Sequence, residues 1–211
     1  MNRPGQKSSQ PLVVWGLIGI NVILFFYMHH FSGYPSGSGR MMYHFGAMFT
    51  SRLEEGQDLW RLFTAMFLHF DIEHLASNML SLFVMGSIVE NGVGHIRTLF
   101  IYLLSGLGGN IVSQLWHQYI GENVLSAGAS GAVFGLMGAL IFASLFARDR
   151  MEGLSPLQIG LMLVLSLYHG VADSVDNAAH IGGLICGFLL CGLLLKLFPG
   201  KKRTDPYDPF A

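Results

Sequence analysis

A serine lies between glycines in the middle of the chain, at the start of a long apolar run. Residues 128–131 read Gly-Ala-Ser-Gly. Glycine lets the backbone turn tightly and lets other segments approach closely, so Ser130 has the setting of an exposed nucleophile. The motif alone favours a simpler interpretation, because small residues in apolar helices usually permit close helix packing, and Gly131, Gly135 and Gly138 share one helical face.

Three polar side chains at the starts of other apolar segments could complete a catalytic site with Ser130. His74 and Asn78 are four residues apart and so lie on one helical face, and His180 begins another segment. Histidine has a reference pKa of about 6.5, which suits it to take the proton of a serine hydroxyl near neutral pH. His74, Asn78 and the backbone N–H of Ser130 could then stabilise an oxyanion. The sequence therefore predicts a Ser130–His180 dyad.

Each of these polar residues also has an alternative role. A polar side chain inside a membrane segment is costly and is a functional-site hypothesis by default, yet a single histidine or asparagine often only bonds to a neighbouring helix. Asp176, four residues before His180, is a candidate third member of the site, although the dyad does not require one. His69, just before the segment with His74, is expected to bond within its loop.

Metal binding is a weaker alternative. The sequence has no His-Glu-x-x-His motif, and its two cysteines, Cys186 and Cys191, lie five apart in one apolar run, where their side chains diverge. Neither a metal pair nor a disulfide is expected of them. His69, His74 and His180 remain as an alternative ligand set. We expect no metal and no cofactor.

The composition indicates what kind of fold must position these residues. The chain has 211 residues, of which 52% are hydrophobic and only 12% charged, and this excludes an ordinary soluble domain. Its net charge of −1 gives no basic field for nucleic acid. We expect an integral membrane protein whose surroundings are the lipid bilayer and which has no nucleic-acid partner.

The hydropathy pattern predicts an all-α, polytopic bundle of six transmembrane helices, because six apolar segments approach the roughly 20 residues that a spanning helix needs. They are residues 11–31, 72–90, 97–116, 129–147, 155–172 and 178–198. Residues 11–198 would form the six-helix domain, with residues 1–10 and 199–211 as short cytoplasmic tails.

The basic residues predict the orientation. With the N-terminus inside, all but three of the 12 lysines and arginines fall on the cytoplasmic side, as positive residues prefer. The second, fourth and sixth helices then run outside to inside, so the four candidate residues share one depth near the outer surface. Glu90, at the opposite end of the second helix, is expected to pair with a loop or backbone donor. Gly183 and Gly187 are expected to pack against the glycines of the fourth helix.

Residues 32–61 form a loop too long for a simple hairpin connection. Phe45, Met48, Phe49 and Leu53 recur at near-helical spacing, which predicts either a helix lying in the membrane interface or an ordinary exposed amphipathic helix. Trp60 suits an interfacial anchor, and Arg61 would bind lipid headgroups or staple the loop.

Taken in order, these motifs resemble those of rhomboid intramembrane serine proteases over nearly the whole chain. The motifs are Trp60-Arg61, His69 followed by His74-x-x-x-Asn78, the Gly-x-Ser-Gly at 128–131, and Ala179-His180-x-x-Gly183-x-x-x-Gly187. The resemblance implies a six-helix bundle with a water-filled cavity, a Ser130–His180 dyad, and an oxyanion hole of His74, Asn78 and backbone amides including that of Ser130. It also implies that the first loop embeds sideways in the outer leaflet.

The resemblance implies a substrate class as well. Substrates would be single-pass membrane proteins cut near the outer end of their transmembrane helix, with entry beside the fifth helix and its following cap, residues 165–177 here. The chain resembles the minimal bacterial form, in an inner membrane with the active site open to the outer side. The residues expected to pack the active site are Gly128, Gly131, Phe134, Gly183 and Gly187.

One position departs from the family pattern. Many relatives have tyrosine four residues after the nucleophile, where its ring stacks on the catalytic histidine, whereas this chain has Phe134. We therefore expect the stacking on His180 to be kept and the hydroxyl to be lost.

Two other function classes compete with a protease. A non-proteolytic relative that acts as a membrane-protein chaperone or quality-control factor typically lacks the serine or the histidine, and both are present here. A transporter usually binds its cargo near the membrane midplane on broken helices, whereas the four candidate residues are expected near one surface.

Overall fold

The computed structural model describes residues 10–147 and 176–198. Residues 155–172, expected as the fifth span, lie outside the described residues, as do the C-terminal tail and most of the N-terminal tail and of the entry segment at 165–177. The other five predicted spans all coincide with helices. These are α1 (Leu12–Phe31), the continuous helix α5–η2–α6 (Ile72–Val93), α7 (His95–Ile120), α8 (Ser130–Phe146) and α10 (Asn177–Leu197).

Four of these helices are long and apolar enough to cross a membrane, and α8 is a shorter apolar helix of 17 residues. The second helix is not regular throughout. It begins as α5 (Ile72–Ser81), passes through the π-helical turn η2 (Leu82–Gly86), and ends as α6 (Ser87–Val93). The six-helix expectation is therefore met for the five segments that the structure describes.

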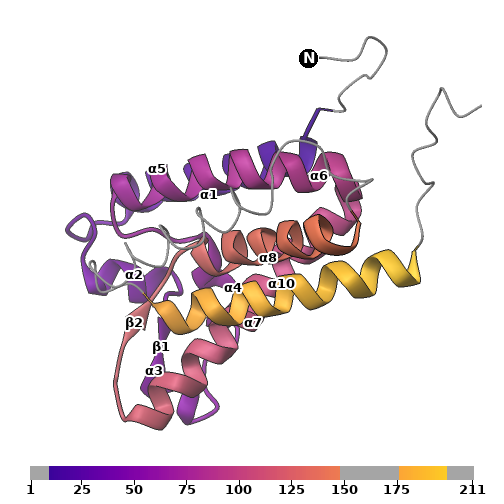
Figure 1. The fold of residues 1–211 in the computed structure, drawn as a ribbon. Coiled ribbons are helices and arrows are strands. Elements are labelled where there is room, and N and C mark those ends of the chain that lie inside the picture. Colours follow the sequence, from indigo (N-terminus) through magenta and orange to yellow (C-terminus); the bar gives the residue numbers. More distant parts are fainter. Residues whose placement is uncertain (1–9, 148–175, 199–211) are drawn as a thin grey trace, which may run out of the picture.

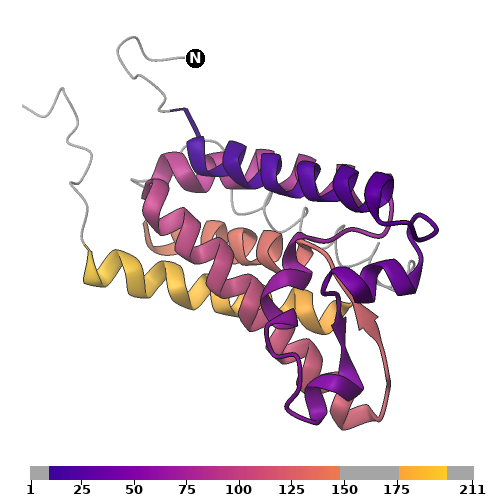
Figure 2. The same ribbon diagram turned by 180° about the vertical axis from the view of Figure 1, so that it is seen from behind.

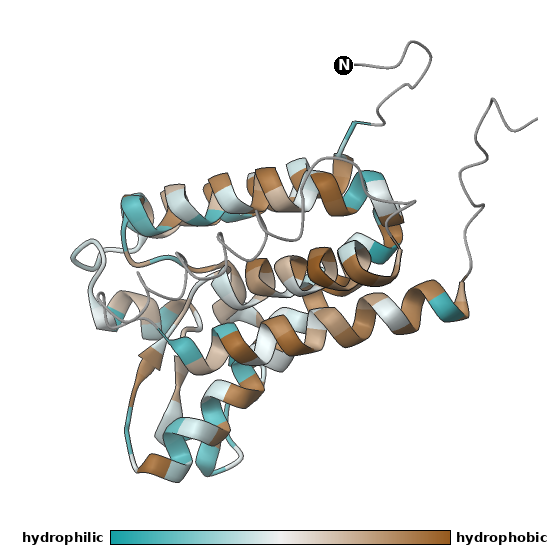
Figure 3. Ribbon diagram, in the orientation of Figure 1, coloured by the Kyte–Doolittle hydropathy of each residue, from teal (hydrophilic) through white to brown (hydrophobic). Residues whose placement is uncertain are grey.

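The helices form two groups (Figure 1). α1 lies beside α5 and α6, while α8 and α10 run side by side. From the opposite side, α7 crosses obliquely over α8 and α10, and its C-terminal end reaches the short loop elements (Figure 2). Apolar residues dominate α8 and α10, whereas the C-terminal end of α7 is more hydrophilic (Figure 3). The main core cluster joins both groups through residues such as Leu82, Tyr102 and Leu136.

Glycines bring α8 and α10 into backbone contact, as the sequence predicts. A Cβ atom added at Gly183 would lie 2.0 Å from the Gly131 carbonyl oxygen, and one at Gly187 would lie 1.9 Å from that of Gly135. A Cβ at Gly138 would lie 2.0 Å from the carbonyl oxygen of Leu184. No side chain larger than hydrogen fits at these positions without moving a helix.

The first loop differs from its prediction. A single helix through Phe45 and Leu53 is wrong, because α2 (Gly39–Phe45) ends at Gly46, whose φ of 104° a helix cannot contain. The strand β1 (Met48–Phe49) follows and pairs antiparallel with β2 (Leu125–Ser126). Next come α3 (Thr50–Glu54), α4 (Arg61–Thr64) and the 3₁₀ turn η1 (Ala65–Phe67).

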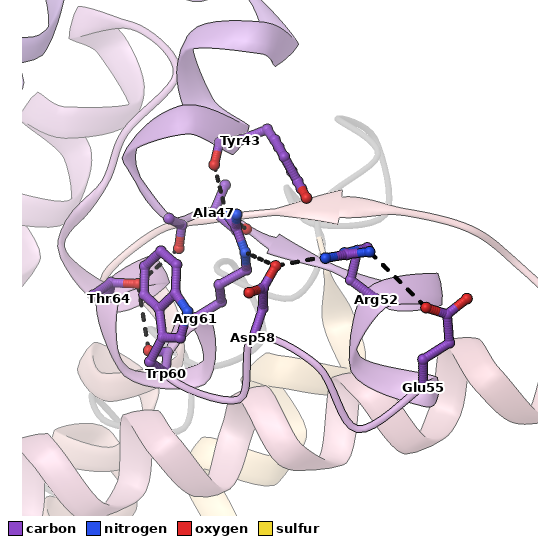
Figure 4. A network of polar contacts seen from close by, with 9 residues as sticks. Tyr43, Ala47, Arg52, Glu55, Asp58, Trp60, Arg61 and Thr64 are labelled. Carbon is purple, nitrogen blue, oxygen red and sulfur yellow. Dashed lines mark hydrogen bonds and ion pairs between the residues drawn. The ribbon is translucent and has the colours of Figure 1, made fainter.

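Arg61 staples this loop, which was one of its two predicted roles (Figure 4). Its guanidinium is 5% exposed and donates to the carbonyl oxygens of Tyr43 and Ala47 and, at 3.1 Å, to the carboxylate of Asp58. It also stacks on the Tyr43 and Trp60 rings. The hydrogen bond from Arg61 is the main cause that lowers the pKa of Asp58 below its ordinary value.

Glu90 fixes the opposite end of the first helix group. Its carboxylate is buried and accepts hydrogen bonds from the backbone N–H groups of Val13 and Val14, each at 2.9 Å, in the first turn of α1. The ring of His95 contacts the same carboxylate. The expectation of a loop or backbone donor for Glu90 is confirmed, and the interaction satisfies helix donors that have no partner inside α1.

The glycine contact predicts a selective loss of stability. Gly187→Ala adds a methyl group against the Gly135 carbonyl, so α8 and α10 must separate, and we expect a destabilisation of about 1–3 kcal/mol. Thermal unfolding of the purified protein in detergent measures it. Gly19→Ala is the matched control, because a Cβ there meets nothing within 4 Å. An equal effect of the two substitutions would show that the backbone contact does not limit stability.

Candidate active site

Ser130 begins α8 immediately after a loop in which Gly128 takes an unusual conformation. The φ of Gly128 is 151°, and its N–H donates to the Ala65 carbonyl at 2.9 Å. A Cβ at Gly128 would lie 3.0 Å from the Nε2 atom of His74 and 3.6 Å from the Ser130 hydroxyl oxygen. Glycine is therefore required here both by its backbone and by space, and the His74 ring and the Ser130 hydroxyl lie on either side of it.

His74 and Asn78 come from the first turns of α5, as the sequence predicts. The side chain of Asp71 caps this helix by accepting from the His74 N–H at 2.7 Å. The Asn78 side chain is buried, and its amide nitrogen donates to the His74 carbonyl at 2.9 Å. Since a side-chain amide has two N–H groups, one remains available to a ligand.

His180 lies in the first turn of α10 and is 4% exposed. Its ring stacks on Phe134 of α8, with centroids 4.1 Å apart and planes 8° apart. Both ring nitrogens are buried, and neither has a hydrogen-bond partner among the described residues. Unpaired buried polar atoms lower stability, so a ring retained in this state indicates a role other than stabilising the fold.

The helix packing brings Ser130 and His180 to the same end of the bundle. Gly131 directly follows Ser130, Gly183 lies one turn after His180, and the backbones touch at these glycines. Among the described contacts, no hydrogen bond joins the Ser130 hydroxyl to the His180 ring. The structure therefore gives the neighbourhood of the two side chains rather than a formed dyad.

His69 departs from its expected role. It is completely buried, its ring lies edge-on to that of His74 with centroids 5.0 Å apart, and neither of its ring nitrogens has a partner among the described residues. The expected hydrogen bond within its loop is therefore wrong. Burial lowers the pKa of His69 to about 3, with a smaller contribution from His74. The ring is neutral at physiological pH.

Sequence reasoning correctly found little sign of a metal centre. Across residues 10–147 and 176–198, no three histidine, cysteine, aspartate or glutamate side chains are arranged to hold a metal ion. The alternative ligand set of His69, His74 and His180 is thereby ruled out. Cys186 and Cys191 are both free thiols.

Two features were missed from the sequence. Asp176 caps α10 and collects hydroxyl groups from β2 and α7, although only its position before a helix was visible as a signal. A cavity of about 650 Å³ also opens at the C-terminal end of α1, away from Ser130. Its lining is Phe25, Phe26, His29, His30, Ser36, Gly37, Phe70, Asp71 and Ile72.

Comparison with known proteins gives a consistent result. A family model described as the rhomboid domain matches residues 56–197. The chain is 36% identical over 189 residues to the rhomboid protease GluP of Bacillus subtilis, covering 89% of this chain and 36% of that protein. It is 39% identical to the mitochondrial RHOMBOID-like protein 6 of Arabidopsis thaliana, covering 78% and 57%. It is 31% identical to the rhomboid protease AarA of Providencia stuartii, covering 89% and 74%.

The buried state of His69 predicts a pH dependence of stability. Above pH 6.5 the ring is neutral in both the folded and the unfolded chain. Between pH 6.5 and about 3, the unfolded chain binds a proton that the folded chain does not. The free energy of unfolding should therefore fall with falling pH, by up to about 1.4 kcal/mol per unit.

Unfolding in detergent at several pH values measures this slope. His69→Gln should flatten it, whereas His30→Gln, at an exposed histidine of α1, should leave it unchanged. Equal slopes in the wild type and in His69→Gln would contradict the assignment.

Proposed function

Because the chain belongs to the rhomboid family, we propose that it is an intramembrane serine endopeptidase. It is an integral membrane protein, and it spans 36% and 57% of the length of the first two curated relatives, so its activity is inferred for the part seen here. The observation that carries the proposal is the pairing of a helix-start serine with a buried histidine that has no structural partner, on two helices in backbone contact.

The proposed reaction is acyl transfer to Ser130. The Ser130 oxygen attacks the carbonyl carbon of the scissile peptide while a ring nitrogen of His180 takes the hydroxyl proton. The tetrahedral intermediate collapses when His180 gives this proton to the leaving amine. Water then attacks the acyl-enzyme, again with His180 as base, and frees the new carboxyl terminus and Ser130.

The oxyanion of the intermediate needs fixed donors at one side of Ser130. The free N–H of Asn78, the ring of His74 and the backbone N–H of Ser130 are the proposed donors. The last of these lies at the N-terminus of α8, where the helix macrodipole also favours negative charge. Loss of one such donor typically slows an enzyme by about 100- to 1,000-fold.

The proposed substrates are transmembrane segments of single-pass membrane proteins. A hydrogen-bonded helix hides its carbonyl groups, so the segment must unwind before attack, and helix-breaking residues reduce the cost of unwinding. The proposed topology has both termini in the cytoplasm of a bacterium and the site near the outer surface of the inner membrane, because cytoplasmic segments hold most basic residues.

Cleavage of a tagged single-pass substrate by the purified protein in liposomes tests the function. Ser130→Ala and His180→Ala should each reduce kcat by at least about 1,000-fold. Matched controls are Ser144→Ala, at the far end of the same helix, and His44→Ala, at an exposed histidine of α2. Both controls should cut normally. A wild type that binds the substrate without cutting it would instead favour the chaperone.

The stacking of Phe134 on His180 predicts a second effect on rate. Phe134→Ala removes the surface that orients the imidazole, and a misplacement of about 1 Å can lower kcat by up to about 100-fold. Phe134→Tyr keeps the ring and should stay close to wild type. Phe146→Ala, at an exposed ring on the same helix, is the control. Unchanged kcat in Phe134→Ala would count against the stacking role.

A further inference from the structure

Asp176, the residue before α10, holds together three separate parts of the chain. Its Oδ1 atom accepts the Ala179 N–H at 3.0 Å and lies 3.7 Å from Nε2 of His117. Its Oδ2 atom accepts the hydroxyl of Ser126 at 3.2 Å and that of Ser113. The Asp176 side chain is only 17% exposed, so these charge-assisted bonds are largely shielded from water.

These partners belong to the segments that carry the proposed nucleophile and base. Ser126 ends β2, four residues before Ser130, and Ala179 directly precedes His180. Ser113 and His117 lie on α7, which packs against both α8 and α10. One carboxylate therefore links the approach to the serine with the start of the histidine helix.

The backbone strengthens the link at the histidine. The His180 N–H donates to the Asp176 carbonyl at 3.2 Å, while the Asp176 side chain caps the helix at Ala179. A negative charge at this end also interacts favourably with the dipole of α10. His117 lies between two carboxylates, because its other ring nitrogen is 3.2 Å from Glu122.

We propose that Asp176 is a positioning residue for Ser130 and His180, an inference that rests on the proposed function. It differs from the aspartate of a catalytic triad, whose carboxylate holds the histidine ring itself. Here the carboxylate is bonded to two hydroxyl groups and to the helix backbone. It acts by fixing the separation of the two segments, and a drift of about 1 Å between reacting groups can cost about 100-fold in rate.

The test measures kcat and KM for substrate cleavage, together with the rate at which a fluorophosphonate labels Ser130. Asp176→Ala should lower kcat and the labelling rate by about 10- to 100-fold and leave KM unchanged. Asp176→Asn should restore part of both, because an amide oxygen can still cap α10. Glu122→Gln, which changes the exposed carboxylate on the other side of His117, is the matched control and should match wild type.

Ser126→Ala supplies a second route to the same answer. It deletes one hydroxyl that Asp176 binds, so it should lower kcat in the single variant and add little in combination with Asp176→Ala. This non-additivity, and the rescue by asparagine, are not expected of general destabilisation. Unfolding temperatures are measured for each variant.

Two results overturn the inference. The first is a wild-type kcat and labelling rate in Asp176→Ala or, should that variant fail to fold, in both Asp176→Asn and Ser126→Ala. The second is full additivity of the two substitutions. In either case a wild type that still cuts and is labelled leaves the proposed function intact, whereas a wild type that does neither contradicts the function itself.

Discussion

The contact on which the rest of this structure depends is the approach of one helix backbone to another. In a bilayer, lipid is as apolar as leucine, so association of helices relies on close packing rather than on removing apolar surface from water. α8 and α10 achieve it with glycine on both sides, and α7 joins them where a Cβ at Gly109 would lie 2.6 Å from the Ala179 carbonyl oxygen. Ser130 and His180 are each next to this packed seam, so their relative position is set by backbone atoms.

The parts outside this seam are held by side chains that bind backbone groups. Glu90 accepts two N–H groups of α1, and Arg61 donates to two carbonyl oxygens of the first loop. Asn110 of α7 donates to the Leu62 carbonyl at 2.8 Å and so ties the loop to the bundle. Each of these side chains is buried, and each satisfies backbone polar groups that would be costly to leave unpaired in a membrane.

The sequence was informative wherever the signal was local or followed from topology. Hydropathy predicted the described spans to within a few residues, and the shared direction of three helices predicted that Ser130, His180, His74 and Asn78 come from helix starts at one end. The first loop was mispredicted because Met48 and Phe49 are fixed by pairing with residues more than 70 positions away. The cluster at Asp176 was equally hidden, since its serine partners are 63 and 50 residues distant in the chain.

The π-helical turn Leu82–Gly86 changes the register of the helix that carries both Asn78 and Glu90. Twelve positions along a regular α-helix would turn these residues about 120° apart, whereas the one extra residue of a π turn reduces the difference to about 20°. Both side chains are buried, at 6% and 1% exposure. A single wide turn thus lets one helix aim a polar group at the core at each of its two ends, one toward the proposed site and the other toward the start of α1.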